Sequence, residues 1–222
     1  MELIINKVEY KYPERITTEM WQAVMQYDFK QSVNWPTIIS IATGAPKTQL
    51  LRADKAALEL GAAILVNLCN VRTECSVKPA NTLTFGEFVD LDVWLTQGVR
   101  DHLGDIAGML IESQWADEAL WAVEQYSNYR TYIYRQYKEL FGLDDDNFEE
   151  EEPQPGRIDN LQAARNWYKI IVDLANDDIL RIDDITDEPL IKVFNFMALR
   201  KERLIAENMK VIEHNTRIKT QR

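Results

Sequence analysis

The sequence is poor in the side chains on which most catalytic and metal sites depend. It holds only two histidines, His102 and His214, and two cysteines, Cys69 and Cys75, in 222 residues. Neither histidine has a serine or cysteine at a spacing typical of a nucleophile and its base. The two cysteines have too few histidines available as co-ligands for a zinc site. The composition predicts reduced, buried thiols, no metal or cofactor, and no enzyme activity.

The chain also lacks the glycine pattern of a nucleotide-binding loop. The stretch "IISIATGAPKTQLL", Ile38 to Leu51, contains a lysine followed by a threonine, as such loops do. A phosphate-binding loop needs glycine directly before its lysine, but here that residue is Pro46, which has no N–H to donate. The stretch instead predicts a helix that ends at Gly44 and a turn into the next helix.

Positive charge is scarce as well, since 25 lysines and arginines stand against 36 acids, for a formal net charge of −11. Proteins that bind DNA or RNA gain affinity from cations placed against phosphates, so general nucleic-acid binding is disfavoured. No apolar run reaches the roughly 18 to 20 residues of a membrane span. The opening "MELIINKVEY" lacks the basic-then-apolar order of a signal peptide. We expect no membrane association, and a protein that stays in a cytoplasm unless it leaves in a particle.

Apolar residues are plentiful, at 46%, and their spacing at the N-terminus predicts a small α+β part, residues 1–83. Alternation of apolar residues on both sides of Asn6-Lys7 predicts a β-hairpin. The stretch 76–84, "SVKPANTLT", could return as a strand beside it. Thr17 or Thr18 can cap a first helix, and residues 50–71 predict a helix that is buried on most sides.

Residues 84–141 predict a helical middle, which opens with the capping-box spacing of Thr84 and Glu87. The composition then changes abruptly, because "DDDNFEEEE" holds seven acids in nine residues. Such a block repels itself and buries no apolar area, so residues 142–157 predict an exposed acidic linker. The block also lacks the glycine and the final glutamate of an EF-hand loop.

Residues 158–222 predict a pair of long helices. The first has an apolar stripe of Leu161, Ala164, Tyr168, Ile171, Val172 and Ala175. The second begins near Pro189 and repeats Leu190, Val193, Phe194, Met197, Leu204, Ile205 and Ile212. It is roughly 40 Å long, and its far end has too few apolar residues to be covered by this chain alone, which indicates a partner. The predicted fold class is α+β, predominantly α, with a hairpin-containing N-terminal part, a helical bundle and a C-terminal pair of long helices.

Two stretches offer candidate partner-binding residues. The first, "EQYSNYRTYIYRQYKELF", interleaves tyrosines with Arg130, Arg135 and Lys138, and could be a stacking platform for single-stranded DNA. On a helix these tyrosines point in several directions, which favours a helix packed on two sides instead. Because tyrosine and arginine also anchor protein interfaces, the candidates here are Tyr129, Tyr132 and Arg135.

The second stretch is the tail from Leu199, with seven lysines and arginines against three glutamates. The candidates are Arg200, Arg203 and Lys210. A basic tail beside an acidic linker suits head-to-tail contact between copies, in a ring or an array. An equally good interpretation is a solvated helix end with positive charge at the C-terminal pole of the helix dipole.

Paired carboxylates are numerous, as at Asp90 with Asp92, Asp177 with Asp178, and Asp183 with Asp184. We expect each pair at a helix boundary, where acids cap the helix or face the positive end of its dipole. A metal-dependent nuclease that uses several of these acids is the enzymatic alternative.

Three pieces carry a resemblance to a known family: "INKVEYKYPERITTEMWQAV" with "WPTIISIATGAP", the central "LTFGEFVDLDVWL", and the late "NWYKIIVDLANDDILRIDDITDEPLIKVFNFMALRKE". The chain resembles structural and assembly proteins encoded by tailed bacteriophages, including crAss-like phages of gut Bacteroidales, some of them similar to tail-assembly chaperones. The resemblance covers most of the chain but not the acidic linker. It implies a non-enzymatic protein that binds other phage proteins, in the virion or in the host bacterial cytoplasm during assembly. It assigns no residue a role.

Overall fold

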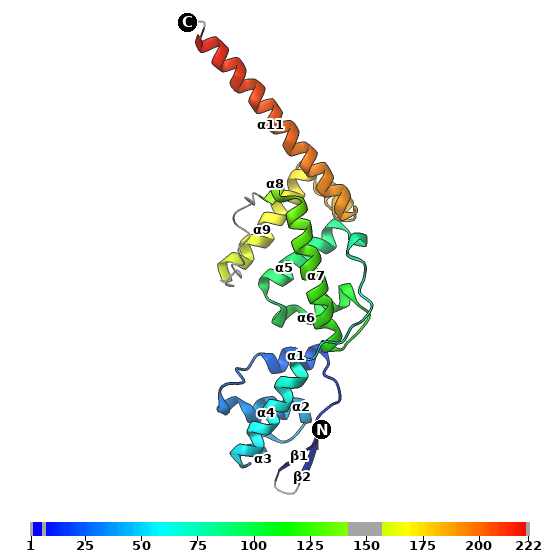
Figure 1. The fold of residues 1–222 in the computed structure, drawn as a ribbon, viewed down its shortest axis with the longest axis vertical. Coiled ribbons are helices and arrows are strands. Elements are labelled where there is room, and N and C mark those ends of the chain that lie inside the picture. Colours follow the sequence, from blue (N-terminus) through cyan, green and yellow to red (C-terminus); the bar gives the residue numbers. More distant parts are fainter. Residues whose placement is uncertain (1, 6–7, 142–156, 221–222) are drawn as a thin grey trace. The chain divides into compact units, whose positions relative to one another are not determined.

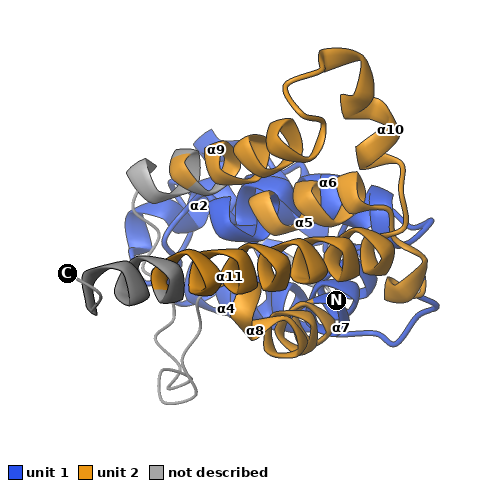
Figure 2. Cartoon of the chain, turned by 90° about the horizontal axis from the view of Figure 1, so that it is seen from above, with its two compact units in different colours: residues 1–78, 94–126 blue, residues 79–93, 127–222 orange. Residues whose placement is uncertain are grey.

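The computed structural model describes residues 2–5, 8–141 and 157–220. The chain forms two compact units, one of residues 1–78 with 94–126 and one of residues 79–93 with 127–222 (Figure 2). The predicted helical middle, 84–141, is therefore divided between the two units, and the predicted linker lies outside the described residues except for Arg157. Figure 1 shows that helices dominate both units, which confirms the predicted fold class.

A β-hairpin opens unit 1, as predicted. Strand β1 (Glu2–Ile5) pairs antiparallel with β2 (Val8–Lys11), with Glu2 opposite Lys11 and Ile5 opposite Val8. The predicted turn residues, Asn6 and Lys7, lie outside the described residues. The predicted third strand is wrong: over 76–84 the chain has no extended strand and forms a short 3-10 turn, η2 (Ala80–Thr82). Pro79 lacks the N–H that a ladder needs, and Thr84 serves to cap the next helix instead.

The first two helices of unit 1 have the predicted cap and the predicted end. The helices of this unit are α1 (Thr18–Met25), α2 (Trp35–Thr43) with η1 (Ser32–Asn34) before it, α3 (Lys47–Leu50), α4 (Lys55–Asn70) and α6 (Val99–Leu110). The Thr17 hydroxyl accepts a hydrogen bond from the Met20 N–H at 3.2 Å, and Gly44 ends α2 in the left-handed region with a φ of 71°. Glycine adopts this conformation without the steric cost of a Cβ.

Helix α4 differs from the prediction, because it buries one face rather than most sides. Leu58, Ala62, Leu65 and Cys69 recur every three or four residues and are buried, whereas Leu60 is 59% exposed. Ile64, Val66 and Leu68 are half-buried and the polar residues of α4 are exposed, so α4 is an amphipathic helix packed mainly on one side.

A charged cluster in unit 1 forms where α7 (Ala116–Gln136) begins. Arg15 donates to Asp117 at 2.8 Å and to Glu118 at 2.7 Å, and the Thr73 hydroxyl donates to Asp117 at 2.6 Å. Desolvation raises the pKa of Asp117, but the hydrogen bonds from Arg15 and Thr73 outweigh it and the pKa is lowered. The pKa of Glu118 is lowered by hydrogen bonds from Ser113 and then Arg15. Both acids are therefore held in their charged form.

Unit 2 is built from α5 (Phe85–Gln97), α7, α8 (Lys138–Phe141), α9 (Arg157–Leu174), η3 (Ile179–Arg181), α10 (Ile182–Thr186) and α11 (Leu190–Thr220), and α5 and α7 also have residues in unit 1. The capping box is present, since the Thr84 N–H donates to Glu87 at 3.0 Å and the Glu87 N–H donates to Thr84 at 3.2 Å. An antiparallel bridge between Thr84 and Pro189 joins the starts of α5 and α11.

Aromatic rings fill the core of unit 2. Phe88 and Phe194 pack edge to face with ring centroids 5.4 Å apart, and Trp167 lies 5.9 Å from Phe88. The prediction placed Tyr168 on the buried stripe of α9, but Tyr168 is 58% exposed and its neighbour Trp167 is buried. Trp167 takes the inner position because its N–H finds an acceptor inside the core, described next.

That acceptor is Asp92, a carboxylate buried in the middle of α5. It accepts a hydrogen bond from Trp167 Nε1 at 2.7 Å and one from the Tyr134 hydroxyl at 2.9 Å, and it pairs with Arg130. The prediction that Asp90 and Asp92 lie at a helix boundary is wrong, because both are inside α5. Asp92 occurs four residues after Phe88 on the core-facing side, and three donors satisfy its charge there.

Candidate protein-binding surface on α11

Helix α11 carries one apolar face from Leu190 to Ile212, and unit 2 covers only the beginning of this stretch. Leu190, Val193 and Phe194 in the first turns are buried, and Met197 one turn later is half-buried. Leu204 and Val211 follow Met197 at intervals of seven residues, and Ile205 lies beside them. Residues seven apart lie on the same side of a helix, so the buried face continues into the second half of α11.

In that second half the apolar side chains are open to solvent. Leu204, Ile205, Val211 and Ile212 are 52%, 48%, 57% and 64% exposed, and we call these four residues the distal apolar face. Figure 1 shows this part of α11 running beyond α7, α8 and α9 of the same unit. Exposed apolar residues that extend a buried face are typical of a surface that another polypeptide covers.

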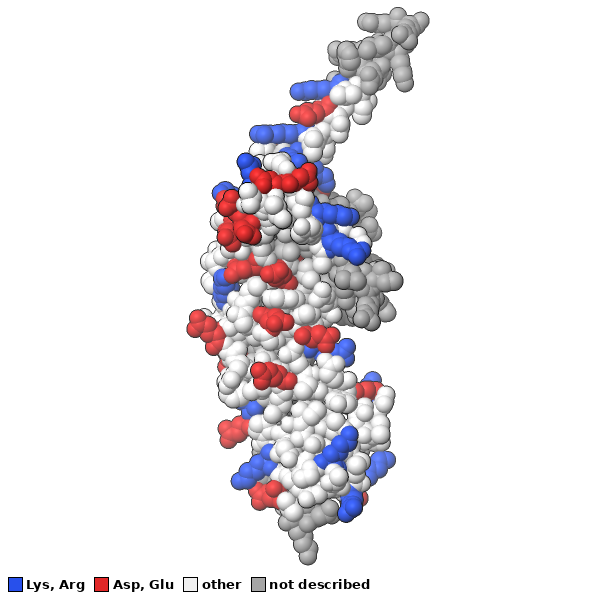
Figure 3. All heavy atoms as spheres, turned by 180° about the vertical axis from the view of Figure 1, so that it is seen from behind, with Lys and Arg blue, Asp and Glu red and all other residues white. Residues whose placement is uncertain are grey.

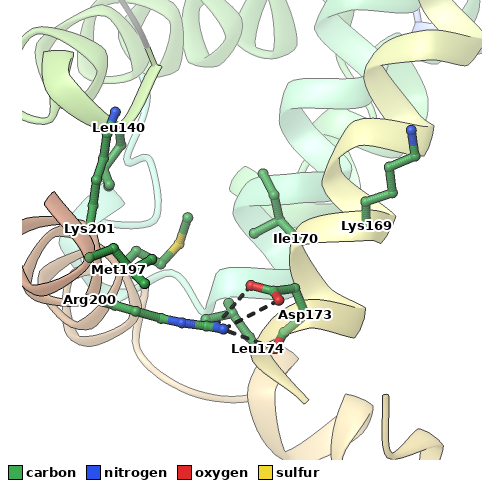
Figure 4. A pocket seen from close by; sticks show the side chains of 9 residues that line it. Leu140, Lys169, Ile170, Asp173, Leu174, Met197, Arg200 and Lys201 are labelled. Atoms are coloured by element: carbon green, nitrogen blue, oxygen red, sulfur yellow. Dashed lines mark hydrogen bonds and ion pairs between the residues drawn. The ribbon is translucent and has the colours of Figure 1, made fainter. Parts of the chain in front are cut away.

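A pocket of about 410 Å³ lies where α11 leaves the rest of unit 2. Figure 4 shows it between α9 and α11, with α8 contributing Leu140. Its apolar lining consists of Leu140, Ile170, Leu174, Met197 and Leu204. Since Leu204 also belongs to the distal apolar face, the pocket and that face form one continuous apolar surface.

The rim of this surface is basic. Arg200 reaches across the pocket to Asp173 at 2.9 Å (Figure 4). Lys201 donates to the carbonyl oxygen of Glu139. Further along the helix, Arg203 and Lys210 are exposed and form no ion pair with another described residue. Figure 3 shows lysine and arginine side chains along the described part of this helix. A partner with apolar and acidic side chains would complement such a surface.

The structure separates the six candidate residues into two sets on different helices. Arg200, Arg203 and Lys210 lie on α11 beside the distal apolar face. Tyr129, Tyr132 and Arg135 lie on α7. In the α7 set the rings of Tyr129 and Tyr132 have centroids 6.4 Å apart, and burial raises the pKa of Tyr129. Tyr132 is 59% exposed, so it alone of these two presents most of its ring to solvent.

The other tyrosines of α7 pack inward, so the predicted alternative of a stacking platform has little exposed aromatic surface. Tyr126 and Tyr137 are buried, and Tyr134 donates to the buried Asp92. Arg130, which the platform needed as a phosphate contact, pairs with Asp92 and lies 4.8 Å from the Tyr134 ring centroid. Helix α7 is packed on more than one side, in agreement with the interpretation of this stretch as a helix packed on two sides.

The described residues include the two thiols and most of the acids that a metal site could use. Among them no group of three or more His, Cys, Asp or Glu side chains is arranged to hold a metal ion. Both cysteines are free thiols: burial raises the pKa of Cys69 to about 11, and the pKa of half-buried Cys75 is raised as well. The expectation of buried thiols thus fits Cys69 better than Cys75. Within the ranges described, no helix is long and apolar enough to cross a bilayer.

Sequence reasoning missed a second exposed surface, in the connection between α9 and α11. Ile179 is 75% exposed and Leu180 is 84% exposed, and acids flank the pair on both sides. The pairs Asp177–Asp178 and Asp183–Asp184 do lie at helix boundaries, as predicted, and Asp178 accepts the Leu180 N–H at 3.1 Å. The signal in the sequence was an apolar pair within an otherwise acidic stretch.

Comparison of the chain with protein-family models, with curated proteins and with solved structures finds no match. The geometry of α11 and the resemblance of the sequence pieces are therefore the observations that bear on function.

Proposed function

We propose that this chain is a non-enzymatic structural or assembly protein of a tailed bacteriophage, which binds other phage proteins in the head, connector or tail region or during its construction. The observation that supports this proposal is the distal apolar face of α11. Leaving four large apolar side chains in water costs free energy, roughly 25 cal/mol for each Å² of apolar area, which a partner would recover on binding. The resemblance described above supplies the phage context.

The proposal has a direct test in the phage that encodes the chain. Purified particles are analysed by quantitative mass spectrometry, with the infected-cell lysate as reference. A fixed ratio of this chain to the major capsid protein supports a virion component. Presence only in the lysate, bound to another phage protein, supports an assembly chaperone. Absence from particles together with no phage protein bound in the lysate contradicts the proposal.

A variant links the test to the proposed surface. In complementation with a plasmid copy, Val211→Asp places a charge on the distal apolar face and should abolish incorporation or binding. Leu60→Asp is the matched control, because Leu60 is 59% exposed on α4 of unit 1 and Val211 is 57% exposed. Equal loss with both variants would contradict a role for α11.

Single-stranded DNA binding is the alternative function, through the tyrosine-rich helix and the basic tail. Retention on a DNA column at low salt, lost as salt rises, would favour it. No observation in the described residues favours it over protein binding.

A further inference from the structure

The distal apolar face needs an occupant, and the structure offers a complementary surface on the same chain. We infer that the distal apolar face of one copy binds the α9–α11 connection, residues 176–188, of a second copy, in a head-to-tail contact. The inference rests on the proposed function, because both use the same face of α11. It names a second copy of the chain as the partner of that face.

The α9–α11 connection has the composition that this contact requires. It contains six acids against one base, and Asp177, Asp183, Asp184 and Asp187 form no ion pair with another residue in the described ranges. Ile179 and Leu180 project from it as the most exposed large apolar side chains described. Acids beside an apolar pair complement Arg203 and Lys210, which are seven residues apart and so lie on one flank of the distal apolar face.

The connection is also held in one conformation, so its surface is formed before binding. Asn176 and Asp177 adopt the left-handed region, with φ of 52° and 60°, which asparagine and aspartate tolerate better than other side chains. The Asp177 N–H donates to the Val172 carbonyl at 3.1 Å, and Asp178 caps η3. Little conformational entropy would then be lost when the connection is covered.

An apolar depression of about 270 Å³ adjoins the connection and can receive side chains from a partner helix. Its apolar lining is Leu174, Ile185, Val193 and Phe196, and Phe196 is 55% exposed. Its volume lies below the range usual for drug-sized ligands, so aliphatic side chains such as those of the distal apolar face fit it better.

One chain cannot make this contact with itself. The connection lies directly before Leu190, where α11 begins, and a continuous helix rises 1.5 Å per residue. Leu204 and Val211 therefore lie about 20 to 30 Å along the axis from Leu190, and the helix cannot fold back. Because the two surfaces differ, each copy can bind one neighbour at each surface, which builds a ring or a filament.

Symmetric pairing of two α11 helices is the competing arrangement, and charge disfavours it. From residue 199 to 212 the helix has four bases and two acids, so two such stretches side by side bring like charges together.

The test uses the full-length chain and two charge-reversal variants, Arg203→Glu with Lys210→Glu, and Asp183→Lys with Asp184→Lys. All these side chains are exposed, so circular dichroism and the melting temperature should not change. Sedimentation velocity over a range of concentrations should show self-association of the wild-type chain that weakens as salt rises. Each variant alone should associate at least about tenfold more weakly, since like charges then face each other.

An equimolar mixture of the two variants should restore association. In the mixture every contact again joins opposite charges: the reversed tail meets the reversed connection, and the unchanged tail meets the unchanged connection. Leu180→Asp should weaken association as well, whereas Val33→Asp, at a residue 74% exposed in unit 1, should not.

Failure of the mixture to associate would overturn the inference, as would a wild-type chain that is monomeric at every concentration. Loss of association with the α11 variant but not with the connection variant would assign the contact to symmetric α11 pairing. A monomeric chain still found in particles would leave the proposed function standing and exclude only this partner.

Discussion

At the scale of single residues, the buried Asp92 shows how a charge can organise an apolar core. Its three donors come from α7 and α9, so one carboxylate ties α5 to both helices. A buried carboxylate is costly unless hydrogen bonds and an opposite charge satisfy it, as they do here.

Replacement of Asp92 by Asn should destabilise unit 2 by about 2 to 4 kcal/mol, because it removes the negative charge that pairs with Arg130 and presents an amide to the other donors. This loss of stability is smaller than for a fully buried ion pair, because the Arg130 side chain is 32% exposed. Urea unfolding followed by tryptophan fluorescence measures the change. Asp90→Asn, at an exposed position of the same helix, should change the free energy of unfolding by less than about 1 kcal/mol.

The Arg15 cluster predicts acid sensitivity of unit 1. The folded-state pKa values of Asp117 and Glu118 are both lowered. A lowered pKa contributes stability that is present above the unfolded-state pKa, near 4, and is lost as the pH falls through the folded-state value. The free energy of unfolding should therefore drop between about pH 5 and pH 3.

The variant Arg15→Gln should flatten that drop, since it removes the charge that lowers both pKa values. Unfolding in urea at several pH values gives the two profiles. Parallel profiles for wild type and variant would mean that other carboxylates cause the acid sensitivity.

At the scale of elements, local rules predicted most helix and strand boundaries. Thr17, Gly44 and the Thr84–Glu87 box act through neighbours within a few residues, and all three are found where the sequence places them. The predictions that failed depended on distant partners. Trp167 rather than Tyr168 is buried because of Asp92, which is 75 residues away. The exposed pair Ile179 and Leu180 was also missed: the acids around it were a signal, but exposure itself depends on how α9 and α11 pack.

The capping box offers a test at this scale. Thr84→Ala removes the acceptor for the Glu87 N–H and should cost about 1 kcal/mol of stability. Thr84→Ser keeps the hydroxyl and should stay within about 0.5 kcal/mol of the wild type. Thermal unfolding of the two variants distinguishes them, and an equal loss in both would assign the effect to the Thr84 methyl group, which both variants lack.

At the scale of the whole molecule, the two halves of α11 have different roles. The covered half contributes to the stability of the fold, and we expect the exposed half to contribute to assembly. A chain that ends at Glu202 keeps Leu190, Val193 and Phe194 in the core and the Arg200–Asp173 pair. Its free energy of unfolding should lie within about 1 kcal/mol of the full chain, because residues 203–212 are exposed. Binding to phage proteins should be lost. A large loss of stability would show that the distal half of α11 contributes to the fold itself.

The interleaved order of the two units also bears on synthesis. Residues 79–93 belong to unit 2 but leave the ribosome before residues 94–126 complete unit 1. Nascent chains generally fold domain by domain from the N-terminus, but here neither unit is one uninterrupted stretch. The ribosome must therefore translate beyond Tyr126 before unit 1 can fold. An expression fragment that ends between residues 78 and 126 should contain neither unit in a folded form.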